Sequence, residues 1–176
     1  LESAGNPEIA KLGIQQPMGS MEGKEVRFGA EASALWGVST TSTSSGSVNS
    51  MHDSHTPLSG GIFLLDMMIN SVWGGVGVGF INFFMFVVIA VFIAGLMIGR
   101  TPEFLGKKIE AREVKIASLI ILLHPFLILV GTAIAVVVAT NNSDIGWLVN
   151  PSFHGFSEML YEFTSAAANN GSGFEG

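Results

Sequence analysis

The sequence predicts an all-α membrane protein. Of its 176 residues, 48% are hydrophobic and only 12% are Asp, Glu, Lys or Arg, about half the charged share of soluble domains. Two uncharged runs, residues 76–99 and 116–139, are each long enough to cross a bilayer. Two polar segments around Gly46 and Gly171 also repeat each other. So few charged residues cannot form the polar surface that a soluble globular protein needs. We therefore expect the chain to lie in a lipid bilayer.

The composition excludes several functional classes. The chain has 8 Lys and Arg against 14 Asp and Glu, which gives a net charge of −6. It offers no basic surface for phosphate groups, and we therefore expect no nucleic-acid partner. The absence of cysteine excludes disulfides, thiol catalysis and cysteine-ligated metals.

Residues 1–27 are predicted to form an external loop, and residues 28–57 a re-entrant helix and hairpin. The second prediction rests on an internal repeat, because a shift of 125 residues superposes Gly46 on Gly171 and matches the residue types on either side. Each copy is too polar to face lipid and ends in a glycine-containing tip. Irregular backbone at membrane depth must line a cavity or be buried in protein, and a re-entrant hairpin satisfies this requirement.

The two tips, residues 43–49 and 169–174, are rich in Ser, Asn and Gly and contain no carboxylate. Glycine permits backbone conformations that aim successive carbonyl groups in one direction, and rings of carbonyls can replace the hydration shell of a monovalent cation. Ca²⁺ and Mg²⁺ prefer carboxylates. The tips therefore predict a K⁺-selective filter. The alternative for residues 39–50 is a Ser- and Thr-rich linker.

The string His52-Asp53-Ser54-His55 follows the first tip and superficially suggests a metal site. No third or fourth ligand lies nearby in the sequence, which a zinc site would need. We expect these residues to cap or brace the exit of the filter. K⁺ is the only metal ion expected, with no transition metal.

Residues 58–99 are too long for one span and predict a broken membrane helix. A short apolar helix, residues 61–73, precedes a glycine-rich loop at residues 74–79 and then the clean span. Such breaks lie on ion pathways in transporters, so we expect an intramembrane gate loop beneath the filter. Its glycines are Gly74, Gly75, Gly77 and Gly79. Asp66 is expected either on the pore side or, as the favoured interpretation, near the outer mouth.

Residues 100–115 hold five of the eight Lys and Arg residues. Short loops with this bias lie in the cytoplasm, which places the two tips on the outer side. The alternative is a solvated turn without orientational meaning. Residues 140–152 are predicted to form a second external loop, and residues 153–176 the second pore helix and filter.

The span at residues 116–139 contains His124 and Pro125. Proline removes one helix hydrogen bond and kinks the helix. We expect His124 to be neutral and bonded to a neighbour or to a freed carbonyl, and the alternative is a proton-sensitive group.

Five strings of residues indicate a resemblance to a known family. They are SMEGKEVRFG at 20–29, GSVNSMHD at 46–53, AGLMIGRTPEFLGKKIE at 94–110, HGFSE at 154–158 and NNGS at 169–172. Together they resemble the KdpA family, the potassium-translocating subunits of bacterial Kdp K⁺-transporting ATPases. The resemblance implies a fold of the K⁺-transporter superfamily, in which four membrane helix–pore helix–membrane helix repeats surround one pore. We expect this chain to be a piece of such a protein, with about one and a half repeats from the third and fourth units.

The resemblance assigns K⁺-binding roles, mainly of backbone carbonyls, to four residues of each tip. They are Ser44, Ser45, Gly46 and Ser47 in the third unit, and Asn169, Asn170, Gly171 and Ser172 in the fourth. It also implies an inner-membrane location in bacteria, and an ion exit at the gate loop toward a partner. In the family, a separate P-type ATPase subunit hydrolyses ATP and small accessory subunits complete the complex, so we expect no catalytic residue and no organic cofactor here. Ser45 departs from the Asn expected in many relatives.

Three other functions stay open from the residues. The first is a K⁺ channel or symporter of the Trk/Ktr/HKT type that is not coupled to ATP, and the strings at 20–29 and 94–110 favour the pump over it. The second is a membrane anchor or assembly subunit without an ion path. The third is a membrane enzyme with a metal bound by His52, Asp53 and His55.

Overall fold

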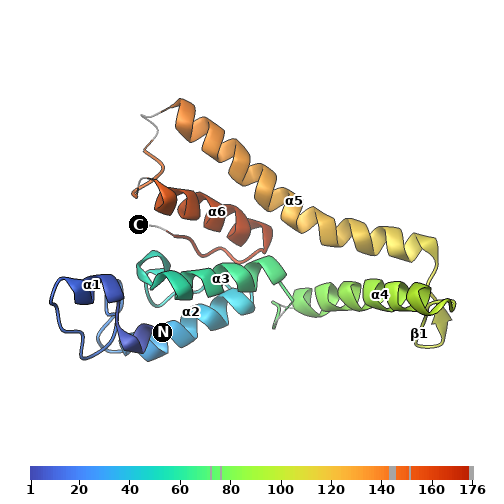
Figure 1. The fold of residues 1–176 in the computed structure, drawn as a ribbon, viewed down its shortest axis with the longest axis horizontal. Coiled ribbons are helices and arrows are strands. Elements are labelled where there is room, and N and C mark those ends of the chain that lie inside the picture. Colours follow the sequence, from blue (N-terminus) through green and yellow to red (C-terminus); the bar gives the residue numbers. More distant parts are fainter. Residues whose placement is uncertain (72, 76, 143–145, 151, 175–176) are drawn as a thin grey trace.

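The computed structural model describes residues 1–71, 73–75, 77–142, 146–150 and 152–174, and these residues are mostly helical (Figure 1). The shorter elements are η1 (Glu2–Ala4), α1 (Pro7–Lys11), η2 (His52–Ser54), β1 (Glu103–Phe104) and β2 (Lys107–Lys108). The longer helices are α2 (Gly29–Ser42), α3 (Pro57–Ile69), α4 (Val78–Ile98), α5 (Ala111–Asn141) and α6 (Phe153–Ala167).

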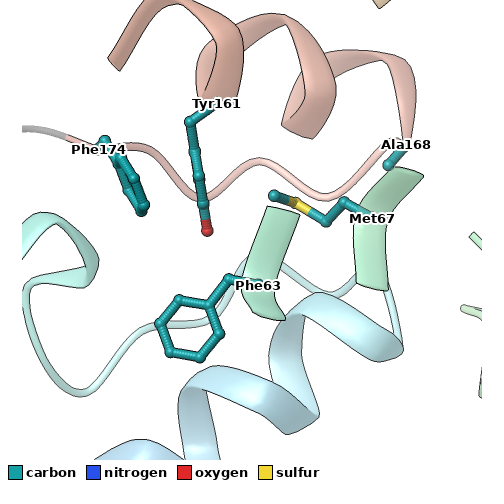
Figure 2. Packing of buried hydrophobic residues seen from close by; sticks show 5 residues of the cluster. All are labelled: Phe63, Met67, Tyr161, Ala168 and Phe174. Atoms are coloured by element: carbon teal, nitrogen blue, oxygen red, sulfur yellow. The ribbon is translucent and has the colours of Figure 1, made fainter. Parts of the chain in front are cut away.

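Helices α2, α3 and α6 pack together at one end of the molecule, with α3 between the other two (Figure 1). Their core joins residues that are far apart in the sequence, as Figure 2 shows: Phe63, Met67, Tyr161, Ala168 and Phe174. Gly37 on α2 makes room for the Phe63 ring, because a Cβ there would lie 2.5 Å from the ring carbon Cζ. This three-helix packing brings the two repeated segments into one unit.

Helices α4 and α5 have the length and composition to cross a membrane. Their most apolar windows have mean hydropathies of 2.7 and 2.6, and little of either window is buried inside the chain. Helix α4 packs against the first part of α5 and extends away from the three-helix end, whereas the later part of α5 runs along α6 (Figure 1). Gly131 on α5 lets the helix approach Phe163 of α6 closely, so α5 links the two ends of the molecule.

The segment between these helices is more ordered than a plain loop. Strands β1 and β2 pair as a small antiparallel hairpin whose turn residues, Leu105 and Gly106, have φ of 51° and 75°. Helix α5 begins at Ala111 rather than near residue 116, because Glu110 and Glu113 form a capping box there. The predicted loop at 100–115 therefore ends inside a helix. Likewise, the predicted external loop at 1–27 contains η1 and α1.

By its number, Pro125 lies about midway along α5, and Figure 1 shows this helix changing direction about midway along its length. The predicted bonding of His124 is observed, and its neutral charge stays a prediction. The Nε2 atom of His124 donates to the carbonyl oxygen of Met67 in the last turn of α3, at 3.1 Å. A carbonyl in a last helical turn has no partner in its own helix, and His124 supplies one.

Helices α3 and α4 are separated by a break whose bounds differ from the predicted ones. Helix α3 ends at Ile69 because Asn70 adopts a left-handed conformation with φ of 46° and ψ of 36°. Helix α4 starts at Val78, so Gly79 lies in its first turn and not in the loop as predicted. Gly74 packs directly on Gly79, and a Cβ on either glycine would collide with the backbone of the other. Residues 72 and 76 of the predicted loop lie outside the described residues.

Candidate ion-binding site

The two predicted tips lie against each other. A Cβ on Gly46 would collide with the carbonyl oxygen of Asn170 and would lie 3.2 Å from the carbonyl carbon of Gly171. The Asn170 side chain also crosses between the units, since its Nδ2 donates to the carbonyl oxygen of Thr40 at 2.8 Å. Two segments separated by 125 residues in the sequence thus form one site.

The internal repeat extends to backbone geometry. Ser44 and Asn169 occupy equivalent positions and have φ of 54° and 56°, while Gly46 and Gly171 have φ of 72° and 98°. Only glycine adopts such values at little cost, and Ser or Asn there stores strain. Both tips therefore turn away from their helices by the same alternation of left-handed residues.

The same hydrogen bonds also recur in both tips. The N–H of Ser45 donates to the carbonyl of Thr40 at 3.1 Å, and the N–H of Asn170 donates to the carbonyl of Ser165 at 2.9 Å. Each pair is related by the shift of 125 residues. These bonds close the C-terminal ends of α2 and α6, where helix carbonyls lack partners, and they fix where each extended tip begins.

An aromatic residue holds the far end of each tip. Nε1 of Trp36 donates to the carbonyl oxygen of Ser47 at 3.0 Å, and the hydroxyl of Tyr161 bonds Oγ of Ser172 at 2.9 Å. Trp36 and Tyr161 are equivalent in the repeat, and each bond spans eleven residues. The sequence alignment paired these aromatics, but their role in supporting the tips became visible only in three dimensions.

An open hollow of about 640 Å³ lies above the tips and is lined by both of them, including Gly46, Gly171 and Ser172. Among the described residues that line it, Glu25 contributes a negative charge and no Lys or Arg is present. Such a mouth favours cations over anions. The chemistry available at the tips themselves consists of carbonyl, amide and hydroxyl oxygens, which suits a weakly hydrated monovalent cation.

The glycine-rich segment lies against the other side of the first tip. The carbonyl oxygen of Ser42, at the end of α2, accepts from the N–H groups of Trp73 and Gly74 at 3.3 and 3.1 Å. A Cβ on Gly75 would be 3.1 Å from the carbonyl oxygen of Thr43. The break between α3 and α4 is therefore packed directly onto the start of the tip.

Asp66 lies at the end of α2. Its Oδ2 accepts from the hydroxyl groups of Thr41 and Ser42, at 3.4 Å each. The carbonyl of Ser42 also accepts from the glycine-rich segment, so Asp66 lies near the break between α3 and α4. The pore side and the outer mouth both stay predictions for Asp66.

Next to Asp66, Asn70 connects three elements. Its Oδ1 accepts from the hydroxyl of Ser44 at 2.8 Å, and its carbonyl accepts from Nδ2 of Asn82 at 2.8 Å. Asn70 thus joins the first tip, the end of α3 and the N-terminal part of α4. No role was predicted for Asn70, although an Asn directly after a helix is a recognisable capping signal.

The imidazoles of His52 and His55 each bond a buried hydroxyl group. Nδ1 of His52 bonds the Tyr161 hydroxyl at 2.9 Å, and Nε2 of His55 bonds the Ser50 hydroxyl at 2.9 Å. The two imidazole centroids are 6.0 Å apart in a T-shaped arrangement. Burial, followed by the proximity of His55, lowers the pKa of His52 to about 4, so its imidazole is neutral at neutral pH.

Asp53 instead bonds residues at and just before the start of α6. Its Oδ1 accepts from Nε2 of His154 at 2.6 Å, and its Oδ2 accepts from Nδ2 of Asn150 at 3.3 Å. Ligand atoms of Asp53, His154 and Glu158 lie within 4.8 Å of one another. Hydrogen bonds already engage them, because Glu158 accepts from both nitrogen atoms of Asn150. The arrangement links η2 to the start of α6.

A buried ion pair below this region was not predicted. Nζ of Lys24 lies 2.9 Å from Oε2 of Glu2, and both side chains are essentially inaccessible. Burial opposes ionisation of Glu2, but bonds with His55, Thr56, Ser59 and Lys24 outweigh it and hold the pKa of the carboxyl below its usual value. The N–H of Thr56 donates to Glu2 at 2.8 Å, so the pair anchors the N-terminal segment to the start of α3.

The chain matches known proteins over its whole length. The family of potassium-transporting ATPase A subunits, KdpA, matches residues 1–176. The chain is 62% identical over 180 residues to the potassium-transporting ATPase potassium-binding subunit of Phocaeicola vulgatus, and 63% identical over 180 residues to that of Bacteroides fragilis. It is 53% identical over 175 residues to the subunit of the same name from Clostridium acetobutylicum.

These matches cover 99% of the chain but only 31–32% of each relative. The chain thus spans about a third of the length of the curated relatives that it matches. With two membrane-length helices in the described residues and a family of transport subunits, it is a membrane protein.

Proposed function

The chain belongs to the KdpA family of potassium-transporting ATPase A subunits, and we propose that it forms part of the K⁺-binding and K⁺-translocating pore of an ATP-driven potassium uptake complex. The observation that carries the proposal is the contact between the two tips, in which Gly46 lies on the carbonyl of Asn170. Peptide oxygens from two pore units then face one site, which is what a dehydrated monovalent cation needs.

The proposed K⁺ ligands are the backbone carbonyls of the two tips. They belong to Ser44, Ser45, Gly46, Ser47, Asn169, Asn170, Gly171 and Ser172. Their contributions differ, because the Ser47 carbonyl already accepts a hydrogen bond from Trp36. A carbonyl has two lone pairs, so Ser47 retains one for an ion. The remaining ligands would come from the two units that this chain does not contain.

The glycine-rich segment is proposed to gate the exit from this site. It is anchored to the Ser42 carbonyl by two N–H groups and lies next to Thr43. A small displacement of this segment would change the start of the tip directly. In the proposed cycle, K⁺ enters from the outside, loses water at the tips, and leaves past Gly74, Gly75, Gly77 and Gly79 when the partner subunit changes state.

ATP hydrolysis is proposed to occur on a separate P-type ATPase subunit, with small accessory subunits in the same complex. The names of the relatives support an ATPase complex, and they disfavour the uncoupled Trk/Ktr/HKT alternative. We place the complex in the bacterial inner membrane, with residues 100–115 in the cytoplasm and the tips open to the outside.

A growth test checks the proposed function. In a strain that lacks other K⁺ uptake systems, the full-length subunit carrying Gly171→Asp should not support growth at low K⁺. Its matched control is Gly13→Asp, because both glycines have positive φ and open space around them, but Gly13 belongs to neither tip. Equal growth of the two variants, with equal amounts of protein in the membrane, would contradict the proposal.

A further inference from the structure

One chain of hydrogen bonds runs from the third unit through the fourth and back again. It joins His52 of η2, Tyr161 of α6, and then Ser172 and Asn170 of the second tip, and it ends on the carbonyl of Thr40 in α2. Each of these residues is at most 6% exposed. Because the members of this hydrogen-bonded series are buried, the position of each one constrains the next.

The direction of every bond can be assigned. Nδ2 of Asn170 donates to the Thr40 carbonyl, so its Oδ1 is the atom that accepts from the N–H and the hydroxyl of Ser172, at 3.0 and 2.5 Å. Ser172 has only one hydroxyl proton. Its Oγ must therefore accept from the Tyr161 hydroxyl, and Tyr161 must in turn accept from Nδ1–H of His52.

The assignment fixes the tautomer of His52. With the proton on Nδ1, neutral His52 has a bare Nε2, and this nitrogen is buried with no hydrogen-bond partner among the described residues. His52 also lines the hollow above the tips. The imidazole is therefore held as a donor to Tyr161 and presents no positive charge to an entering cation.

The ring of Tyr161 is fixed as firmly as its hydroxyl. It stacks on Phe174 with centroids 3.9 Å apart and planes 18° apart. Figure 2 shows the ring between Phe174 and Met67, with the hydroxyl directed away from α6 toward Phe63. A side chain held in this way on both faces transmits its position to Ser172 with little freedom.

We propose that Tyr161 is a positioning residue that sets the ion selectivity of the second tip, and that His52 of the third unit orients it. This inference rests on the proposed function. Tyr161 does not touch the ion; it holds Ser172 and, through it, the Asn170 amide that ties the two tips together. The first tip has the simpler counterpart, in which Trp36 bonds the Ser47 carbonyl directly.

The test is Tyr161→Phe in the full-length subunit within its assembled complex. The ring and its packing remain, while the hydroxyl and two buried hydrogen bonds are lost, and such bonds together correspond to about a tenfold change in an equilibrium constant. We expect the KM for K⁺ uptake to rise about tenfold, the preference for K⁺ over Rb⁺ to fall, and the maximal rate to change little.

Two further variants separate positioning from general stability. Thr164→Val is the matched control: it removes a fully buried hydroxyl from the same helix, whose bond goes only to the Leu160 carbonyl in that helix. It should leave both the KM and the K⁺ to Rb⁺ ratio unchanged. His52→Asn keeps a donor near the position of Nδ1 and should stay close to the parent, whereas His52→Leu should resemble Tyr161→Phe.

The outcomes are distinct. An unchanged KM and ion ratio in an assembled Tyr161→Phe complex would overturn the inference while the proposed function stands. A change of equal size in Thr164→Val would also overturn it, because the effect would then follow from lost packing. Failure of the parent complex to take up K⁺ at all would instead contradict the proposed function.

Discussion

Gly46 and Gly171 are equivalent in the repeat but differ in their surroundings. A Cβ on Gly46 meets the Asn170 carbonyl, whereas a Cβ on Gly171 meets nothing within 4 Å, and both residues have positive φ. Gly171→Ala therefore adds only backbone strain, about 1–2 kcal/mol, while Gly46→Ala also pushes the tips apart. In uptake assays, Gly46→Ala should abolish high-affinity transport, and Gly171→Ala should raise the KM for K⁺ by about tenfold. The reverse order would contradict the contact between the tips.

The buried pair of Glu2 and Lys24 is expected to matter for stability. Lys24→Met leaves the Glu2 carboxylate buried without its counter-ion and should lower the free energy of unfolding by about 3–5 kcal/mol. Thermal unfolding of the full-length subunit in detergent measures this. Adding Glu2→Gln to Lys24→Met should restore much of the free energy of unfolding, since neither position of the pair then carries a buried charge.

The control for this pair lies on the surface. Lys11 and Glu8 form an ion pair of 2.6 Å whose side chains are 69% and 75% exposed. Exposed pairs contribute about 0–1 kcal/mol, so Lys11→Met should change the melting temperature little. If Lys11→Met lowered the melting temperature as much as Lys24→Met does, the loss of stability in Lys24→Met could not be attributed to the burial of its ion pair.

His52 should make stability depend on pH. Its pKa in the folded state is about 4, against an ordinary value of 6.5, because of burial and then of His55. The unfolded chain therefore binds a proton that the folded chain does not. The free energy of unfolding should fall by about 1.4 kcal/mol per pH unit as the pH drops from 6.5 toward 4. The His52→Asn variant should lose this part of the dependence, and an identical pH profile in both proteins would contradict it.

Some of these residues could be predicted from the sequence, and others could not. Gly46 and Gly171 could be found because the repeat superposes them, and both are left-handed in the structure. Glu2 and Lys24 could not, since two charges 22 residues apart carry no periodic signal. The contact of Asp66 with α2 could not be predicted either, because an apolar helix with one carboxylate does not indicate which of its ends meets another helix.

At the level of elements, composition predicted the helices better than their bounds. The two long helices follow from uncharged runs, and the break between α3 and α4 follows from the glycines. The bounds depended on local caps, namely Asn70 at the end of α3 and the Glu110–Glu113 box at the start of α5. These caps extend or shorten an element by one or two turns without changing its kind.

The orientation of the hairpin between α4 and α5 can be tested by labelling. With cysteine absent from this chain, a full-length subunit without other cysteines and carrying Lys107→Cys should react with a membrane-impermeant maleimide only in inverted vesicles. Lys11→Cys, at an exposed residue of the segment that we propose to be external, should react only in right-side-out vesicles. Labelling of both positions from the same side would contradict the assignment of residues 100–115 to the cytoplasm.

For the whole molecule, two long-range features organise the rest. Helix α3 packs between α2 and α6, and α5 returns the chain to the three-helix end, so that the tips of two units meet (Figure 1). The repeat predicted that the two tips would be alike, and only the fold shows that they touch. The side-chain hydrogen bonds between them, from Asn170 to Thr40 and from His52 to Tyr161, form only because the two segments are in contact. No pattern in the sequence predicted them.

We propose that the two glycine-centred tips together bind the transported ion. Anomalous diffraction from crystals of the complete subunit in its complex, grown with Tl⁺ in place of K⁺, locates the bound ion. We expect anomalous peaks between residues 44–47 and 169–172, which disappear in Gly46→Ala. Peaks confined to another part of the protein, with the two tips unoccupied, would contradict it.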